Sequence, residues 1–149
     1  MQRLILGAGK HWQKHPGDVF VDIKPFPGID VVCDLNQIPW TWHDDAWDEV
    51  SAIHLVEHLG SLVNFMNECH RILKPGGSLY IETPCAGANV DLEFADPTHI
   101  RCYRPHTFIN YFTRAGIEKF GYTDKAWAVM HLEVKNDCII FHAQPIKQA

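Results

Sequence analysis

The sequence has little basic charge, and this scarcity excludes one class of partner. It carries 13 lysines and arginines against 18 acidic residues, and its formal net charge is −5. Most nonspecific affinity for DNA comes from lysines and arginines that neutralise backbone phosphates. We therefore expect no nucleic acid partner for this protein.

Paired cysteines and long apolar runs are also missing. The five cysteines are widely spaced without any C-x-x-C pair, so zinc knuckles and redox motifs are not indicated and reduced, mostly buried thiols are expected. Every apolar run is far shorter than the roughly 20 residues that cross a membrane. The N-terminal segment reaches Gly7 too soon for the apolar region of a signal peptide. These absences predict a cytoplasmic protein with no membrane partner.

The residues that are present suit one globular domain. Of the 149 residues, 46% are hydrophobic and 21% are charged, close to the averages for soluble domains. Short β-branched runs that end in glycine, acidic residues or proline predict strands. The predicted strands are residues 3–8, 19–23, 30–34, 47–54, 78–83, 126–134 and 138–143.

Two segments show helical spacing of apolar residues. Residues 59–73 form the clearest predicted helix, which Pro75 and the two following glycines stop. Residues 105–115 predict a second helix, with Gly116 behind it. Its predicted inward residues are Phe108, Ile109 and Phe112. Residues 85–104 show no strong period, and we expect a long loop that covers a site.

This order of elements predicts an α/β fold with a mostly parallel central sheet and a C-terminal antiparallel hairpin. The short polar connection at residues 135–137 joins the last two strands. In sheets of this kind, ligands bind beyond the carboxyl ends of the strands. The chemistry-bearing residues of this sequence fall at such ends.

Three successive strand ends carry matching chemistry. Gly7-Ala8-Gly9 follows the first strand, and its glycines let the backbone approach a ligand closely. Asp22 closes the second strand, where a carboxylate accepts hydrogen bonds from ribose hydroxyls. Asp34 closes the third strand and supplies a further acceptor, which could reach an adenine amino group. Singly each acid also fits a solvated loop residue or a helix cap, but together they indicate a nucleotide-type site.

The chain resembles the class I S-adenosylmethionine-dependent methyltransferases, and within them the type 11 family. The resemblance covers residues 4–84, and its most specific segment is the Leu-Lys-Pro-Gly-Gly turn at residues 73–77. It implies a Rossmann-like fold and S-adenosyl-L-methionine as the cofactor. The cofactor-binding residues that it implies are Gly7, Ala8, Gly9, Asp22, Ile23, Asp34, Leu35, His54 and Leu55.

Two features depart from the family pattern. Trp12 stands where a Gly-x-Gly-x-x-Gly motif would have its third glycine. Residues 10–18 are too few for an ordinary crossover helix, so the chain corresponds to a compact, short-loop form of the family. The sequence also begins at its first strand, without the N-terminal helices that often cover the cofactor. We therefore expect an open acceptor site, or one that a homo-oligomer or a partner chain completes.

The segment from His54 to His58 matches H-x-x-E-H, the zinc motif of the inverted zinc proteases. That motif needs a helix, whereas His54 ends a β-type run, so the hydrolase interpretation is disfavoured. Glu57 is expected to act as scaffold, capping the following helix, and His58 is a candidate catalytic base.

A second polar cluster lies in the long loop at residues 96–103. His99 is a candidate base near neutral pH, Arg101 could fix a carboxylate or phosphate, and Tyr103 could stack on an acceptor. Asp96 is included with Arg101 and Tyr103 as substrate-binding. Two alternatives stay open: an ordered loop pinned by Asp96 and Arg101, or a metal held by Asp96, His99 and a nearby histidine. No resident metal is predicted.

The sequence therefore predicts a methyltransferase that acts on an oxygen or nitrogen of a small polar acceptor, with a sugar or nucleotide-sugar as the suggested class. Methyl transfer from a sulfonium is an in-line displacement, for which alignment and exclusion of water supply much of the rate. The alternatives are an S-adenosylmethionine-binding module without independent activity, and a nicotinamide-dependent oxidoreductase, whose glycine turn and strand-end acid would be similar.

Overall fold

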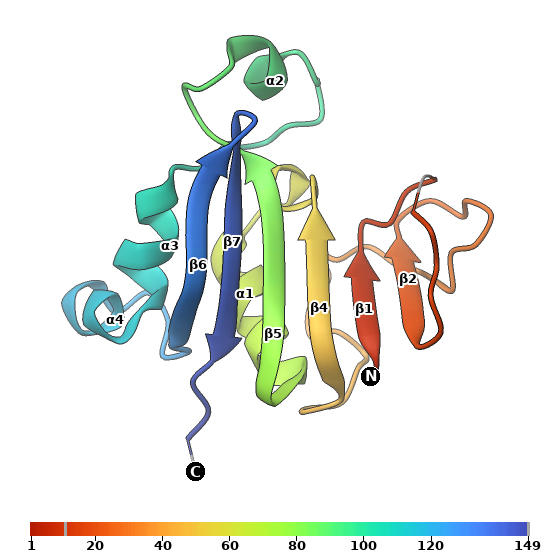
Figure 1. Cartoon of the computed structure of the whole chain (residues 1–149), viewed down its shortest axis with the longest axis horizontal. Coiled ribbons are helices and arrows are strands. Elements are labelled where there is room, and N and C mark those ends of the chain that lie inside the picture. The colour runs from red at the N-terminus through yellow and green to blue at the C-terminus, as the bar shows by residue number, and fades with distance from the viewer. Residues whose placement is uncertain (11, 149) are drawn as a thin grey trace.

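The computed structural model describes residues 1–10 and 12–148, and it is built on one mixed sheet (Figure 1). Seven strands lie in the order β3-β2-β1-β4-β5-β7-β6. The first five run parallel, and β7 and β6 are antiparallel, so the predicted hairpin is confirmed. The strands are β1 (Arg3–Leu6), β2 (Asp18–Asp22), β3 (Val31–Val32), β4 (Trp47–Ile53), β5 (Leu73–Pro84), β6 (Trp127–Lys135) and β7 (Cys138–Pro145).

The main helix is α1 (Leu62–Ile72), which lies behind the sheet in Figure 1. The Ser61 hydroxyl accepts a hydrogen bond from the Asn64 amide, and this cap satisfies one of the unpaired donors at the helix start. The buried side of α1 includes Phe65, Met66 and Cys69, which recur at helical spacing. This face packs into the same core as the apolar residues of the central strands, such as Leu4 and Ile81.

The region between β5 and the hairpin contains more helix than the sequence predicted. A short helix, α2 (Val90–Phe94), interrupts the expected loop, and the side chain of Asn89 caps it. The predicted second helix is two helices, α3 (Pro105–Phe112) and α4 (Arg114–Phe120). Thr113 ends the first in an extended conformation, and its hydroxyl caps the second, so the chain bends where the sequence indicated one helix.

Two packing predictions for this region are therefore wrong. Ile109 is 43% exposed, whereas Phe108 and Phe112 are buried as expected. Gly116 is a buried residue inside α4, and a Cβ there would lie 2.1 Å from the carbonyl oxygen of Asn110. The close approach of α4 to the end of α3, which no local pattern encodes, requires glycine at this position.

The connection from β1 to β2 confirms the compact form of the fold. The described residues between these strands contain no helix, as the short segment predicted. No helix in the described part of the chain has the length and apolar character needed to cross a membrane. Because the five parallel strands all point the same way, their carboxyl ends meet at one edge of the sheet, and the predicted site residues follow these ends.

Candidate active site

The glycine turn after β1 is locked by the acid at the end of β2. Gly7 and Gly9 have φ angles of +67° and +61°, which favour glycine because a Cβ is strained there. The Gly9 amide donates to Asp22 Oδ2 at 2.9 Å, and the Lys24 amide donates to Asp22 Oδ1 at 3.0 Å. A Cβ on Gly7 would lie 3.1 Å from Leu55 Cδ1, so the turn also packs closely on the residue that follows β4.

A cavity of about 480 Å³ opens at this edge of the sheet, and we call it the cofactor cavity. Its walls combine carboxylates with apolar side chains from the ends of four neighbouring strands and from the loop before His99. Its lining residues are Gly7, Asp22, Ile23, Lys24, Phe26, Cys33, Asp34, Leu35, Asn36, His54, Leu55, His58, Leu59 and Thr98.

The structure brings nearly all the predicted cofactor residues to this one cavity. The exceptions are Ala8, which is buried beneath the turn, and Gly9, whose amide is held by Asp22 without lining the cavity. The lining residues that sequence reasoning missed include Phe26, Asn36 and Thr98. These three lie in loops, so no periodic pattern marks them, and only the folding of their loops over the strand ends places them here.

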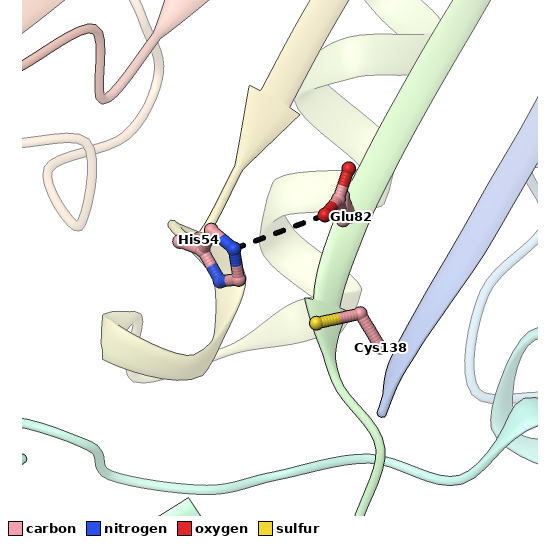
Figure 2. A group of neighbouring side chains, drawn as sticks. All are labelled: His54, Glu82 and Cys138. Carbon is pink, nitrogen blue, oxygen red and sulfur yellow. Dashed lines mark ion pairs between the residues drawn. The ribbon is translucent and has the colours of Figure 1, made fainter. Parts of the chain in front are cut away.

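His54 leaves β4 in a strained conformation that turns its side chain toward β5. Its φ angle of +51° is uncommon for a residue other than glycine, and such strain clusters at functional sites. Figure 2 shows its ring facing Glu82 and Cys138, with Nε2 3.9 Å from Glu82 Oε1. Burial raises the pKa of the Cys138 thiol, so this sulfur stays protonated at neutral pH and is a poor metal ligand.

Glu57 lies at the centre of a polar network beneath the cavity. It belongs to a one-turn 3₁₀ helix, η1 (Val56–His58), and is fully buried. Its Oε2 accepts from the Thr83 hydroxyl at 2.8 Å, and its Oε1 has no hydrogen-bond partner. His54 Nδ1 and His58 Nε2 lie 3.6 Å and 3.9 Å from Oε1. The nearby Glu57 carboxylate raises the pKa of His54, although burial opposes the shift.

This geometry disfavours the interpretation of the His54–His58 segment as the zinc site of a hydrolase. The inverted protease motif requires both histidines on one helix. His54 precedes η1 in a left-handed conformation, and only His58 belongs to the turn. The two histidines therefore approach Glu57 from different backbone segments.

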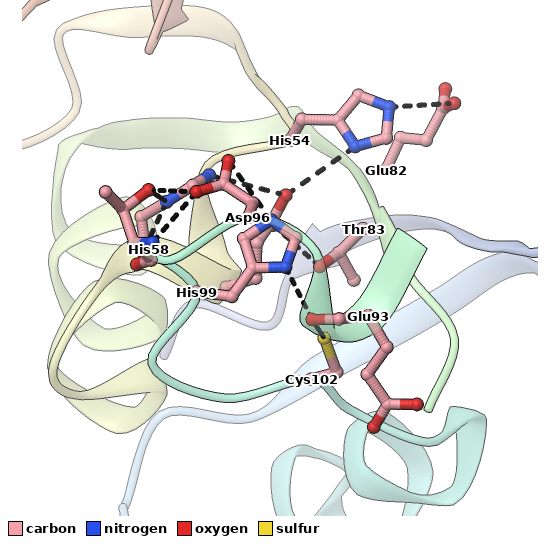
Figure 3. A network of polar contacts seen from close by, with 10 residues as sticks. His54, His58, Glu82, Thr83, Glu93, Asp96, His99 and Cys102 are labelled. Atoms are coloured by element: carbon pink, nitrogen blue, oxygen red, sulfur yellow. Dashed lines mark hydrogen bonds and ion pairs between the residues drawn. The ribbon is translucent and has the colours of Figure 1, made fainter. Parts of the chain in front are cut away.

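The loop after β5 folds back onto this network (Figure 3). The amides of Ile100 and Arg101 donate to the Glu57 carbonyl oxygen at 2.8 and 3.2 Å. His99 then lies beside His58, with ring centroids 4.8 Å apart. Asp96 Oδ1 accepts from the amide and the hydroxyl of Thr98, so Asp96 orders the loop. The predicted candidate bases from two distant segments are thus brought together.

A second cavity, of about 540 Å³, lies on the other side of Leu59, and we call it the aromatic cavity. Arg101 and Tyr103, both predicted to contact the acceptor, line it, and the Arg101 guanidinium lies 5.7 Å from the Tyr103 ring centre. Burial raises the pKa of Tyr103, so its hydroxyl is a neutral donor near pH 7. The other aromatic lining residues are Tyr111, Phe112 and Tyr122.

Comparison with known proteins gives a consistent picture. A sequence profile of the family described as "Methyltransferase domain" matches residues 7–120, more than half of the chain. Among curated proteins, the mitochondrial ubiquinone biosynthesis O-methyltransferase of Rattus norvegicus is 43% identical over 54 residues. This match covers 35% of the chain and only 15% of that enzyme, so the chain corresponds to a small part of the curated relative.

Solved structures share the fold at low sequence identity. The SAM-dependent methyltransferase from Archaeoglobus fulgidus superposes with a TM-score of 0.66 at 17% identity, over 96% of this chain and 86% of that chain. A putative methyltransferase in complex with the Trm112 activator from Haloferax volcanii gives 0.65 at 13% identity, over 96% and 81%. These likenesses confirm the predicted mostly parallel sheet with its antiparallel C-terminal strands.

Proposed function

The chain belongs to the methyltransferase-domain family. From this premise we propose that it is a class I S-adenosylmethionine-dependent enzyme that methylates an oxygen or nitrogen of a small polar acceptor. The earlier resemblance to the type 11 family is compatible with this membership. The observation that carries the proposal is the convergence of residues from separate strand ends on one cavity.

The chemistry of the cofactor cavity fits S-adenosylmethionine. Asp22 and Asp34 each offer carboxylate oxygens, which suit ribose hydroxyls and an adenine amino group. Ile23, Phe26 and Leu35 supply apolar walls of the kind that enclose an adenine ring. Gly7 lines the cavity without a side chain, so the methionine portion could approach its backbone closely. When bound, the cofactor supplies an electrophilic methyl group on a sulfonium.

The aromatic cavity is the proposed acceptor site. Its aromatic side chains offer flat apolar surfaces for a ring, and Arg101 provides a guanidinium that suits a phosphate or carboxylate. A sugar or nucleotide-sugar combines both features, so this class is the first to test. Asp96 orders the loop that carries Arg101 and Tyr103, which makes it a positioning residue for the acceptor.

His58 and His99 are the proposed catalytic residues. His58 lines the cofactor cavity, and His99 lies against it on the loop that leads to the aromatic cavity. An acceptor hydroxyl or protonated amine must lose a proton during transfer, and imidazole is suited to this near neutral pH. Leu59 lines both cavities, so the acceptor and the methyl donor would meet beside these two rings.

Calorimetry of S-adenosylhomocysteine binding tests the cofactor assignment. Asp22→Ala should weaken binding by roughly 1–3 kcal/mol, which is about 5- to 150-fold, because ribose hydroxyls lose their acceptor in a partly dry cavity. Glu118→Ala removes an exposed carboxylate from α4 and should leave binding unchanged. Equal affinities for wild type and Asp22→Ala would show that the cofactor is not held as proposed.

A second candidate is a binding module that needs a partner for activity. The structural neighbour from Haloferax volcanii forms a complex with a methyltransferase activator, and this observation favours considering it. A screen of metabolite pools for labelled methyl transfer distinguishes an active enzyme from such a binding module. Transfer that His99→Ala abolishes, with cofactor binding intact, supports the enzyme. Tight cofactor binding without transfer to any pool favours the module, which a second copy or a partner chain would complete.

A further inference from the structure

We infer that Glu57, His58 and His99 hold a divalent transition-metal ion beside the cofactor cavity. Metal binding at this site would be separate from methyl transfer, since protein side chains alone supply the ligands. The sequence by itself predicted no resident metal. The tertiary contacts between η1 and the loop after β5 provide the reason to assign one.

The unpartnered oxygen of Glu57 is the first observation. The side chain is fully buried, its Oε2 is satisfied by Thr83, and its Oε1 has no hydrogen-bond partner. Within residues 1–10 and 12–148, no lysine or arginine forms an ion pair with this carboxylate. A buried carboxylate oxygen without a partner is costly. A cation at this point would remove the cost.

The orientation of the two imidazoles is the second, independent observation. His99 Nδ1 lies 2.8 Å from the Glu93 carbonyl oxygen. His58 Nδ1 lies 3.2 Å from the Thr98 carbonyl oxygen and 2.9 Å from its hydroxyl. When Nδ1–H donates to a carbonyl, Nε2 is left as a lone pair, which is the usual arrangement for a metal-binding histidine. Both rings can therefore donate the Nε2 lone pair to a metal ion.

The donor atoms are close enough to bind one ion after small side-chain rotations. Glu57, His58 and His99 each offer a ligand atom, and these atoms lie within 4.8 Å of one another. Donors at roughly 2.0–2.2 Å from a tetrahedral zinc lie about 3.3–3.6 Å apart. Two imidazoles and a carboxylate suit zinc and other first-row transition ions better than calcium or magnesium.

Other donor sets in this region are weaker. Asp96 Oδ2 lies 3.8 Å from His99 Nε2, but Asp96 is exposed and its other oxygen already accepts from Thr98. His54, Glu82 and Cys138 form a second group of potential ligands, in which the exposed His54 ring lies beside a buried thiol (Figure 2). Among these donor sets, and within residues 1–10 and 12–148, only the Glu57 set contains a fully buried carboxylate oxygen that lacks a hydrogen-bond partner.

The place of the ion gives it a role that rests on the proposed function. Three protein ligands leave a further coordination position, as in catalytic zinc sites. His58 lines the cofactor cavity, and the chain that follows His99 lines the aromatic cavity. An acceptor hydroxyl could occupy the open position, where the cation would lower its pKa so that its proton passes to solvent. The resulting oxygen would bond to the methyl carbon as the bond from that carbon to the sulfonium breaks, and S-adenosylhomocysteine would leave. His58 and His99 would then act through the cation.

Metal titration tests the site without methyl transfer. Protein freed of metal with a chelator is titrated with zinc chloride in competition with a chromophoric chelator. We expect one equivalent to bind to wild type, and at least a roughly 100-fold loss of affinity in His99→Ala and in His58→Ala. His106→Ala, which removes an exposed histidine of α3, is the matched control and should bind as wild type does.

Two further measurements keep the result unambiguous. Cobalt(II) should give visible absorption in wild type that His99→Ala abolishes, whereas Cys138→Ser should leave it unchanged. S-adenosylhomocysteine affinity, measured on the same variants, reports on the proposed function separately. Absence of stoichiometric zinc binding by folded wild type, or equal zinc affinity in His99→Ala, would overturn the inference even if the cofactor binds.

Discussion

Gly7 and Gly9 share a backbone conformation but differ in what surrounds them. Both have positive φ angles, yet a Cβ on Gly7 would press on Leu55, whereas a Cβ on Gly9 would meet nothing within 4 Å. Only Gly7 lines the cofactor cavity. Substitutions at these two positions therefore distinguish the effect of backbone strain from the effect of the shape of the site.

We expect Gly7→Ala to weaken S-adenosylhomocysteine binding at least about tenfold, and Gly9→Ala to weaken it much less. Both variants should lose roughly 1–3 kcal/mol of stability, since each places alanine in a left-handed conformation. Calorimetry and urea unfolding measure the two effects. Equal losses of affinity would mean that strain alone, and not the contact with Leu55, governs the turn.

His70 should make stability depend on pH. Its ring is buried against Trp127, and burial, aided by the charge of Lys147, lowers its pKa below the ordinary value of about 6.5. The unfolded chain therefore takes up the proton first on acidification. The stabilising contribution is present above about pH 6.5 and is lost as the pH falls below it toward the lowered pKa.

The check is urea unfolding of wild type and His70→Gln at pH 7.5 and 5.5. Wild type should lose more of its free energy of unfolding between these values than the variant does. Other histidines titrate in both proteins, so the difference reports on residue 70. A pH dependence that the substitution leaves unaltered would contradict the prediction.

At the scale of elements, the end of α1 anchors the segment that leads into β4. Arg71 donates to both carboxylate oxygens of Glu68, and to the carbonyl oxygens of Trp40 and Trp42. Glu68 in turn accepts from the Trp40 amide at 2.6 Å. These contacts, together with backbone hydrogen bonds from Asp45 and Ala46 to the last turn of α1, hold the irregular segment against the helix.

Arg71→Ala should lower the free energy of unfolding by about 2 kcal/mol, the scale of hydrogen bonds to charged groups. Arg114→Ala, at the exposed start of α4, should change it by less than about 0.5 kcal/mol. Chemical denaturation measures both. Similar losses in the two variants would show that Arg71 is not an anchor.

At the scale of the whole molecule, one edge of the sheet carries the site. The ends of β1, β2 and β4 and the loop after β5 reach the cofactor cavity. In Figure 1, α1 lies behind the sheet, and α3 and α4 lie at the side of β6. A ligand in this cavity contacts segments spread over most of the chain. Its binding should therefore stabilise the entire fold.

A thermal-shift panel uses this coupling to separate enzyme classes. S-adenosylhomocysteine at 100 times its dissociation constant should stabilise the protein by about 2.7 kcal/mol through mass action. NADH and NADPH should leave the melting temperature unchanged. Stabilisation by a nicotinamide cofactor alone would reject the methyltransferase assignment in favour of the oxidoreductase.

The sequence by itself determined the order of the strands along the chain and the main helix, and it predicted which residues at the strand ends would bind the cofactor. Buried parallel strands need apolar runs, and their turns need glycine or an acid at fixed positions, so these features are written locally. Asp22, Asp34 and Leu55 could be predicted to lie at the site because each is at the end of a strand or two residues beyond it. The order of the strands then brings them together.

Only the tertiary structure decided how the long loop meets this edge. The break between α3 and α4, the exposure of Ile109 and the cavity contacts of Phe26 depend on neighbours far along the chain. The approach of His99 to Glu57 spans more than 40 residues and follows from two amides that donate to the Glu57 carbonyl oxygen. Local periodicity records which face of a segment is buried, but it does not record which distant segment covers that face.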